Sequence, residues 1–267
     1  MNLAGDPSLY LVLSFAQSAL AAILIVIGGI VEGYGYGLSF GTKWPYAKTM
    51  PALARTGDPE AWHRIVATLL GVNSLVILVI KPGVPEAVGL ILIAVTALLG
   101  MATLYVLSGK APSFFQGLHD VLAYLTLLNY LLIAFGGAEL FWSYLLTTVV
   151  LHSYFLTIFM GGFTTGRRGF KKEIGSFVFP KTASQWVWVI HALSVLLFAL
   201  TLAYFASVYD VALVFLLVEM GVGFLSYQAV NANAARPGVL IPLHQLFSVL
   251  ILVSIFFGWH VQIPLLG

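Results

Sequence analysis

The sequence contains no cysteine and few charged residues. Without cysteine, the chain of 267 residues can form no disulfide, no iron–sulfur cluster and no thiolate metal site. Charged residues make up 8% of the sequence, whereas a soluble domain carries about 25%. The net charge of +2 gives no reason to expect nucleic acid as a partner. Because so few charges cannot cover a surface that faces water, the sequence predicts a protein of the lipid bilayer.

The sequence instead contains long runs of apolar residues. Each run has roughly 20 residues, which as a helix crosses a hydrocarbon layer of about 30 Å, and none alternates in the manner of an outer-membrane strand. The first run is too long, with too little positive charge beside it, for a cleaved signal peptide. We therefore predict an all-α polytopic membrane protein with eight transmembrane helices. The predicted spans are 9–31, 63–80, 86–107, 117–136, 143–163, 186–207, 210–230 and 241–260.

The second half of the sequence repeats the first. "IGGIVEGYGYG" (27–37) and "MGGFTTGRRGF" (160–170) each carry a Gly-Gly pair and, four residues after it, a further glycine. Duplication of a four-helix unit accounts for this pattern economically, and the alternative is chance likeness among apolar helices. We predict two tandem four-helix bundles, an N-terminal half of residues 1–139 and a C-terminal half of residues 140–267.

Four of the six histidines lie at matching places in the repeat. They stand near the start of the second, fourth, sixth and eighth spans, which run in the same direction through the membrane: His63, His119, His191 and His244. They therefore form one layer near one face of the membrane. The other two do not match, because His152 falls in the middle of the fifth span and His260 at the far end of the eighth.

Each half supplies two imidazoles from two different helices. Helical bundles build cofactor sites from side chains on facing helices, and imidazole is a standard axial ligand of heme iron. A zinc site would need three or four converging ligands. We predict one bis-histidine heme in each half, with small residues giving the macrocycle room beside the backbone: Gly28, Gly100, Gly161 and Gly221. The plainer interpretation of any single histidine is packing between helices.

Basic residues crowd the same face as the histidines. Eleven of the twelve lie there, and only Lys81 lies on the other face: Lys43, Lys48, Arg55, Arg64, Lys110, Arg167, Arg168, Lys171, Lys172, Lys181 and Arg236. Arginine is the favoured bidentate partner of carboxylates, so we predict that Arg64 holds heme propionates and that most of the others form a solvated surface. Taken alone, the positive-inside rule would place this face in the cytoplasm.

Two acidic residues stand out in this apolar chain. Glu60 precedes His63 by three residues, so both share a helix face, and we predict that Glu60 lies over the heme edge and serves acid–base chemistry. The alternative is that Glu60 only favours the helix N-terminus through the dipole. Glu219 falls within the seventh span, where an acid is costly and usually faces the bundle interior. We predict that it lies beside the C-terminal heme or hydrogen-bonds a neighbouring helix.

The run "IGGIVEGYGYGLSFGTKWPY", followed by "EAWHRIVATLLGV", resembles the first half of the heme A synthase family. The family pattern has a Gly-Gly pair, a Gly-rich loop with Trp-Pro, and Glu-x-x-His-Arg opening the second helix. "ALLGMATLYVLSGKAPSFFQGLHDVLAYLTLL" (97–128) is similar to the family's third and fourth helices, and "IHALSVLL" and "LHQLFSVL" match its second half more loosely. The chain departs from the family in lacking the cysteine pair that many bacterial members carry.

The resemblance implies a heme-dependent oxidoreductase that oxidises the C8 methyl of heme O to the formyl of heme A, in the biogenesis of a terminal oxidase. His63, His119 and Arg64 would hold the substrate heme O, with Glu60 as the catalytic residue. His191 and His244 would ligate the iron of a heme b cofactor. The implied partners are the lipid bilayer, a heme O synthase as donor and a terminal oxidase as recipient. The implied location is the plasma membrane, with the histidine layer toward the outer face. The resemblance does not identify the electron donor or decide whether the protein forms a homo-oligomer.

Two other functions fit the same residues. A diheme b-type cytochrome would transfer electrons without modifying a heme, and a heme carrier or assembly factor would do no chemistry. A bis-histidine iron has no open position for dioxygen, which favours electron transfer. An acid three residues before a ligand favours an enzyme, because an electron carrier does not require it.

Overall fold

The computed structural model describes residues 7–262, with side chains as far as Trp259. Within that range there is no strand, and eight helices are long and apolar enough to cross a membrane. These are α1 (Pro7–Gly33), α3 (Pro59–Ile80), α4 (Val84–Leu107), α5 (Phe114–Ala134), α7 (Val149–Arg168), α8 (Ala183–Tyr204), α9 (Ala206–Ala232) and α10 (Leu240–Gln262). The predicted all-α polytopic fold with eight transmembrane helices is confirmed.

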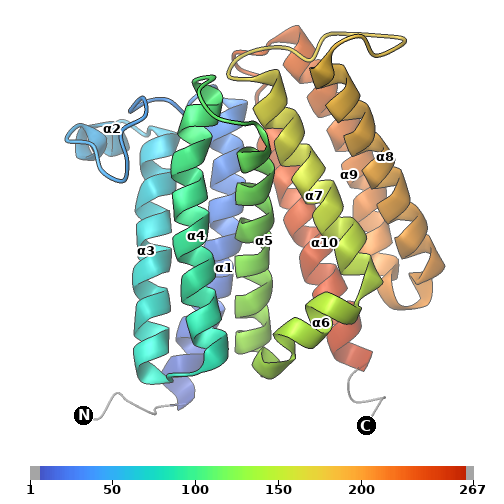
Figure 1. Cartoon of the computed structure of the whole chain (residues 1–267). Helices are drawn as coiled ribbons and strands as arrows, with labels where there is room; N and C mark the ends of the chain where they lie inside the picture. Colours follow the sequence, from blue (N-terminus) through green and yellow to red (C-terminus); the bar gives the residue numbers. More distant parts are fainter. Residues whose placement is uncertain (1–6, 263–267) are drawn as a thin grey trace.

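The spans fall into two groups of four, and consecutive spans run in opposite directions (Figure 1). In the N-terminal half, α1, α3, α4 and α5 form a ring in which each helix packs against the next. In the C-terminal half, α7 packs on α8, α8 on α9 and α9 on α10. Because each half holds an even number of spans, both halves have the same orientation, as parallel repeats do.

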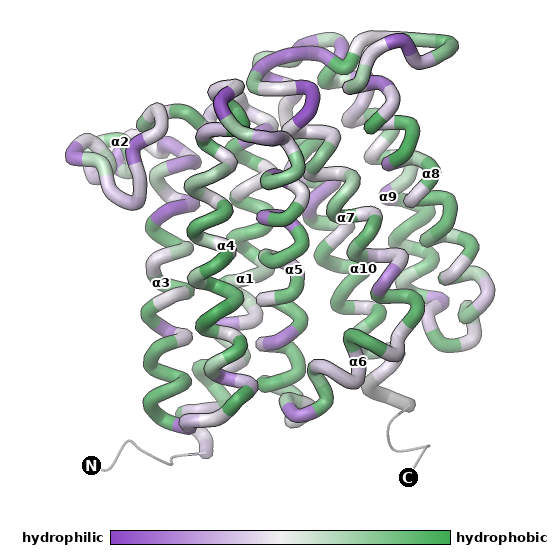
Figure 2. Tube along the Cα trace, viewed as in Figure 1, coloured by the Kyte–Doolittle hydropathy of each residue, from purple (hydrophilic) through white to green (hydrophobic). Residues whose placement is uncertain are grey.

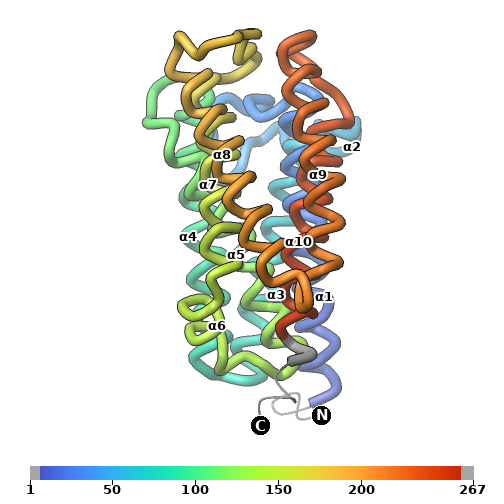
Figure 3. Tube along the Cα trace, turned by 90° about the vertical axis from the view of Figure 1, so that its right-hand side faces the viewer, coloured from blue at the N-terminus to red at the C-terminus, as the bar shows by residue number. Residues whose placement is uncertain are grey.

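The two ends of the bundle differ in their connections. The upper end in Figure 1 carries the longer, more hydrophilic loops, including the short helix α2 (Met50–Arg55), as the colouring of Figure 2 also shows. The lower end carries the turn at Lys81, the 3-10 turn η1 (Ala138–Leu140) and the short helix α6 (Phe141–Thr147). The side view in Figure 3 places the α7–α8 and α9–α10 connections at the same upper end. The eleven basic residues therefore share that end.

Local sequence signals start the helices that matter for the site. Asp58 caps α3 by accepting a hydrogen bond from Ala61 N at 2.9 Å, and Pro59 occupies the first helical position, where its missing N–H costs nothing. Thr182 and Gln185 form a capping box at the start of α8. These caps fix the helix starts at the end where the histidines lie.

The predicted fifth span, 143–163, is wrong at its start. Thr148 has extended backbone angles (φ −88°, ψ 96°) and separates the short helix α6 from α7, which begins at Val149. His152 therefore lies in the first turn of α7 rather than at mid-helix, and its Nε2 lies 2.8 Å from Leu145 O. Hydropathy misplaced the boundary because α6 is itself apolar.

The repeated glycines explain how the two halves join. α5 packs against α7, and α1 packs against α10, so the two contacts are equivalent in the repeat. A Cβ on Gly29 would stand 2.8 Å from Pro242 Cα, and one on Gly162 would stand 2.9 Å from Gly117 Cα. Small residues permit such close approach between membrane helices. The second glycine of each Gly-Gly pair is thus a contact between halves.

The glycine four residues further on has the same task in both halves. A Cβ on Gly33 would stand 2.5 Å from Gly238 O, just before α10, and one on Gly166 would stand 2.6 Å from Ser113 O, at the start of α5. Gly238 N also donates to Gly33 O at 2.7 Å. Each glycine lets the end of one helix pass beside the start of a helix in the other half.

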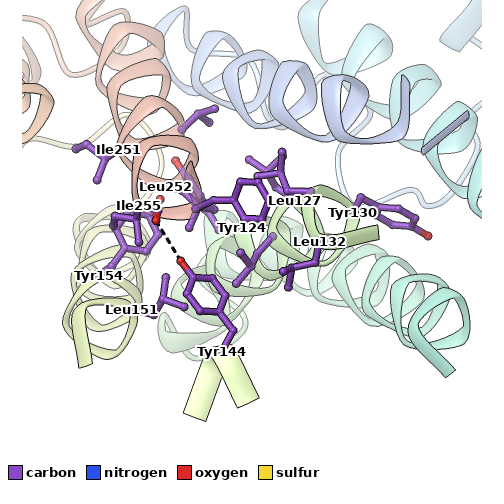
Figure 4. Packing of buried hydrophobic residues seen from close by; sticks show 14 of the residues in the cluster. Tyr124, Leu127, Tyr130, Leu132, Tyr144, Leu151, Tyr154, Ile251, Leu252 and Ile255 are labelled. Carbon is purple, nitrogen blue, oxygen red and sulfur yellow. Dashed lines mark hydrogen bonds between the residues drawn. The ribbon is translucent and has the colours of Figure 1, made fainter. Parts of the chain in front are cut away.

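Below this contact, buried tyrosines and aliphatic side chains fill the space between the halves (Figure 4). Leu127 of α5 and Leu252 of α10 are fully buried in this core. Tyr154 OH donates to Ser248 O at 2.9 Å, and Tyr144 OH to Ile255 O at 3.3 Å. The tyrosines add apolar area while their hydroxyl groups are satisfied by helix carbonyls.

Candidate functional site

The four repeat-matched histidines lie in the first three turns of α3, α5, α8 and α10, at the upper end of the bundle in Figure 1. Their positions form the layer that the alternating helix directions predict. His63 and His119 lie close enough to interact electrostatically, and so do His191 and His244. The structure therefore brings together one pair within each half. The side chain of His260 lies outside the described residues.

Each histidine ring rests against a glycine of the preceding span. The distances from an ideal Cβ on the glycine to His Cε1 are 3.6 Å for Gly28 and His63, 3.2 Å for Gly100 and His119, 3.3 Å for Gly161 and His191, and 3.2 Å for Gly223 and His244. An added Cβ would press on the ring at Gly100, Gly161 and Gly223 and would be in ordinary van der Waals contact with it at Gly28. We refer to these four pairs as the Gly–His units, and they fix each ring by its Nδ1–Cε1 edge.

The Gly–His units include three of the four glycines that the sequence singled out. Gly28, Gly100 and Gly161 were expected to make room for a macrocycle, and each in fact lies against a histidine ring. Gly221 lies against no histidine ring, because a Cβ there would have no neighbour within 4 Å. The counterpart of Gly100 is Gly223.

The hydrogen bonds of the rings determine which nitrogen remains for a ligand. His119 Nδ1 lies 3.0 Å from Thr96 O, and since a carbonyl can only accept, Nδ1 carries the proton. The lone pair of Nε2 is then available. In His63 and His191, Nδ1 is buried without a hydrogen bond, although each interacts with a backbone carbonyl of the preceding span. In all three rings Nδ1 therefore faces a helix, and Nε2 remains available for a ligand.

The fourth unit has a carboxylate at the place where His119 has the carbonyl of Thr96. His244 Nδ1 lies 2.6 Å from Glu219 Oε1, and Ser248 Oγ donates to the same oxygen at 3.0 Å. Glu219 stands one turn before Gly223 on α9, as Thr96 stands one turn before Gly100 on α4. The predicted hydrogen bond from Glu219 to a neighbouring helix is confirmed. A buried carboxylate at this place makes the second histidine pair electrostatically different from the first.

A cavity of about 420 Å³ lies in the N-terminal half. Its lining brings together all four residues predicted for the N-terminal site: Glu60, His63, Arg64 and His119. Its volume falls in the range of roughly 300 to 1,000 Å³ that is usual for small-molecule sites. The wall near the histidines is formed by the glycines of the first two Gly–His units.

Glu60 and Arg64 are locked together at the mouth of this cavity. Arg64 Nη2 lies 2.7 Å from Glu60 Oε1, and Ser39 N donates to Glu60 Oε2 at 2.7 Å. Arg64 Nη1 donates to Lys43 O at 2.7 Å and to Pro45 O at 3.4 Å. The pair therefore shapes the loop after α1 against the start of α3. Asp58 caps α3, and Glu60 lies in the first turn of that helix, where the helix dipole also favours a carboxylate.

Sequence reasoning missed Arg168 as a site residue. It was one of the basic residues of which most were expected to form a solvated surface, but its side chain is 6% exposed and lines the cavity. Arg168 Nη2 lies 2.7 Å from Glu32 Oε1, which ties the end of α7 to the end of α1. Lys171 lines the cavity as well. The C-terminal half thus closes the mouth of a cavity that belongs to the N-terminal half, and nothing in the sequence pattern distinguishes these cations from their neighbours.

Tyr124 and Gln245 form a second link between the halves. Tyr124 OH donates to Gln245 Oε1 at 2.9 Å, and both residues line the cavity. Gln245 follows His244 directly in the chain. The wall of the N-terminal cavity is therefore continuous with the helix that carries the second histidine pair.

The donor set fits a planar metal macrocycle better than a bare ion. Among the described residues no group of three or more histidine, cysteine, aspartate or glutamate side chains could hold a metal ion. Two histidines from facing helices, each with Nε2 available, could ligate the metal of such a macrocycle. Arg64, Arg168 and Lys171 at the mouth suit its carboxylates.

Comparison with family models, with curated proteins and with solved structures found no match to this chain. The fold and the site define a multi-pass helical membrane protein with a pair of histidines in each of two repeated halves. The heme A synthase resemblance therefore rests on the sequence motifs alone.

Proposed function

We propose that this protein is a heme-modifying membrane oxidoreductase of the heme A synthase type, which oxidises the C8 methyl of heme O to a formyl group. The observation that carries the proposal is the cavity that brings His63, His119, Glu60 and Arg64 together. The four Gly–His units add support, because they orient two imidazoles in each half and leave Nε2 on each.

Each half has its own role in the proposal. His63 and His119 hold the substrate heme through Nε2, and Arg64, Arg168 and Lys171 bind its propionates. His191 and His244 hold a heme b, which when bound supplies a one-electron redox centre. Glu219 positions His244 through its Nδ1. The hydrogen-bonded contact of Tyr124 and Gln245 lies between the two pairs.

Glu60 is the group that we assign to proton transfer. Conversion of a methyl to a formyl group, with the oxygen counted as entering from water, releases four electrons and four protons. The electrons pass to an acceptor of the dioxygen or quinone class. The alcohol formed on the way has a proton to lose, and a carboxylate within reach contributes about 10² to 10⁴ in rate. Ser39 N and Arg64 hold the Glu60 carboxylate at the cavity wall.

One observation favours a second candidate, a diheme b-type cytochrome that transfers electrons without modifying heme. Both oxygens of Glu60 already have partners, Arg64 and Ser39, so Glu60 also has a structural task. A bis-histidine iron is closed to dioxygen, which suits an electron carrier. In this candidate Glu60 only orders the mouth of the cavity.

Extraction of the pigments from purified protein separates the two candidates. Heme O or heme A together with heme b is expected for the enzyme. Heme b alone, in both sites, would overturn the enzyme and support the cytochrome. The source strain must make heme O, so that its absence from the protein is informative.

We further propose that the protein lies in the plasma membrane with the histidine layer toward the outer face, receives heme O from a heme O synthase and serves a terminal oxidase. The eleven basic residues at that face argue for the opposite orientation, and binding of propionates accounts for some of them. Single cysteines at Lys43 and Lys81 test the orientation with a membrane-impermeant thiol reagent on intact cells. Labelling at position 43 alone is expected, and labelling at position 81 alone would reverse the assignment.

A further inference from the structure

Polar side chains run through the lower part of the N-terminal half, away from the histidines. We call them the polar column: Tyr10, Ser14, Gln17, Ser18, Asn73, Ser74, Glu86, Asn129 and Tyr130. Seven of the nine are buried, and Tyr10 and Asn73 are partly buried. Figure 2 shows the hydrophilic positions inside α1, α3 and α5. Buried polar groups in a membrane span are costly and usually mark a function.

The column begins at the membrane face that carries Lys81. Glu86 is 1% exposed, although it lies in the first turn of α4. Tyr10 OH donates to Glu86 Oε1 at 2.5 Å, and Lys81 Nζ lies 3.9 Å from the same oxygen. Lys81 is largely exposed, so an exposed cation touches a buried carboxylate. This is a point at which a proton can pass between solvent and interior.

The middle of the column is a set of hydrogen bonds between α1, α3 and α5. Ser74 Oγ and Tyr130 OH lie 2.5 Å apart, and either can be the donor. Asn73 Nδ2 donates to Gln17 Oε1 at 2.7 Å. Tyr130 points away from the core between the halves and into the N-terminal half (Figure 4). Gly89 leaves it room, because a Cβ there would stand 2.6 Å from Tyr130 OH.

The upper end of the column reaches the floor of the cavity. Ala21, Leu70 and Thr126 line the cavity, and each lies one helical turn from a member of the column: Gln17, Ser74 and Tyr130, respectively. Since one turn of an α-helix rises about 5.4 Å, the column ends directly beneath the cavity that holds the first histidine pair.

The C-terminal half serves as an internal comparison, because it lacks the column. In the register that aligns the Gly–His units, the counterparts of Gln17, Ser18, Ser74, Glu86 and Tyr130 are Val150, Leu151, Leu202, Tyr209 and Ile255. All five counterparts belong to the buried hydrophobic core. Tyr209 keeps a hydroxyl, and the other four members of the column have polar counterparts: Ser143, Thr147, Thr201 and Ser254. The side-chain hydrogen bonds of Thr147, Thr201 and Ser254 go to carbonyls of their own helices, so they do not link helices as the column does.

We propose that the polar column is a proton path between the Lys81 face of the membrane and the floor of the N-terminal cavity. Carboxyl and hydroxyl groups accept a proton on one side and donate one on the other, and the Ser74–Tyr130 pair can be polarised in either direction. The amides of Gln17 and Asn73 stabilise the charge in transit. The purpose of the path rests on the proposed function, because the proposed oxidation of the substrate releases four protons in the cavity.

Hydrogen exchange at a single engineered thiol tests the path without any assay of activity. The chain has no cysteine, so the infrared S–H stretching band of one introduced cysteine has no background. Ser74→Cys and Ser18→Cys place the thiol in the column. Leu202→Cys and Leu151→Cys place it at the matched positions of the C-terminal half. The rate at which the S–H band converts to S–D in heavy water reports access of protons to that position.

We expect the Ser74→Cys thiol to convert about tenfold or more faster than the Leu202→Cys thiol. We expect the same difference between the Ser18→Cys thiol and the Leu151→Cys thiol. Adding Glu86→Leu or Tyr10→Phe, either of which removes a group at the entrance, should slow Ser74→Cys toward the Leu202→Cys rate. Equal slow exchange in both halves would overturn the path and leave the column as helix contacts. Fast exchange that neither entrance variant slows would overturn entry from the Lys81 face. Neither outcome depends on the bound pigment, so failure of the proposed function would show separately, in the pigment extraction.

Discussion

Glu219 Oε1 lies 2.6 Å from His244 Nδ1, and no other Gly–His unit pairs its ring with a carboxylate. A negatively charged acceptor on Nδ1 makes the imidazole a stronger donor through Nε2. With the hemes of the proposed function, the C-terminal pair is therefore expected to hold its heme more tightly, and to favour the oxidised iron more, than the N-terminal pair.

Glu219→Gln is expected to raise the midpoint potential of the C-terminal heme and to weaken its retention about 10- to 100-fold, as loss of an outer hydrogen bond does at other metal-ligating histidines. Redox titration and heme loss to a scavenger measure the two effects. Ser248→Ala is the control, because it removes the other partner of Glu219 and leaves the contact with His244. An unchanged potential in Glu219→Gln would reduce the residue to a packing role.

Gly223→Ala and Gly221→Ala form a matched pair on α9. Alanine in a helix interior is favoured over glycine by about 0.8 to 1 kcal/mol, so Gly221→Ala, with no neighbour within 4 Å, is expected to raise the thermal stability slightly. The new Cβ in Gly223→Ala would stand 3.2 Å from His244 Cε1 and must displace the ring. We expect a diminished low-spin heme b spectrum in Gly223→Ala only. Identical spectra would show that the glycine does not position the ring.

The two histidine pairs are expected to bind independently. His191→Ala or His244→Ala should remove the low-spin heme b signal and leave the heme of the N-terminal half, because each pair belongs to its own four-helix group. Heme content and absorption spectra of the purified variants measure this. Loss of both hemes from a well-folded variant would contradict independent sites.

The Glu32–Arg168 pair is expected to stabilise the contact between α1 and α7. Removing one partner of a fully buried ion pair costs about 3 to 5 kcal/mol because the other charge is left uncompensated. The Glu32 side chain is 26% exposed, so Arg168→Leu alone should lower the thermal unfolding temperature by less than that cost implies. Glu32→Leu with Arg168→Leu should recover much of the loss, and equal effects of the single and double variants would show that the pair is not coupled.

The sequence predicted the membrane spans and the histidine layer because both depend on composition and on alternating helix direction. It could not predict the start of α7, since the apolar helix α6 merges with it in any hydropathy profile. It chose Gly221 over Gly223 because two positions so near in sequence differ only in the face of the helix on which they lie. It missed the burial of Arg168 because that depends on Glu32, which is far away in the chain.

The sequence also could not predict hydrogen-bond partners that come from distant loops. Glu60 was expected over a heme edge, and it does line the cavity, yet its second oxygen accepts from Ser39 N in the loop after α1. No periodicity relates these two residues. The polar column went unnoticed for a similar reason, because single serine, asparagine and tyrosine residues on separate helices do not form a motif.

Pigment analysis of Glu60→Gln beside the wild-type protein, both from cells that make heme O, tests the central claim most directly. The substitution keeps the shape of the side chain and removes its charge, while the histidines remain. We predict that the variant retains heme O and heme b but forms heme A about 10² to 10⁴ more slowly, with the hydroxylated heme as the accumulating product. A normal yield of heme A from Glu60→Gln would contradict the catalytic role of Glu60, and heme b alone in both proteins would contradict the function itself.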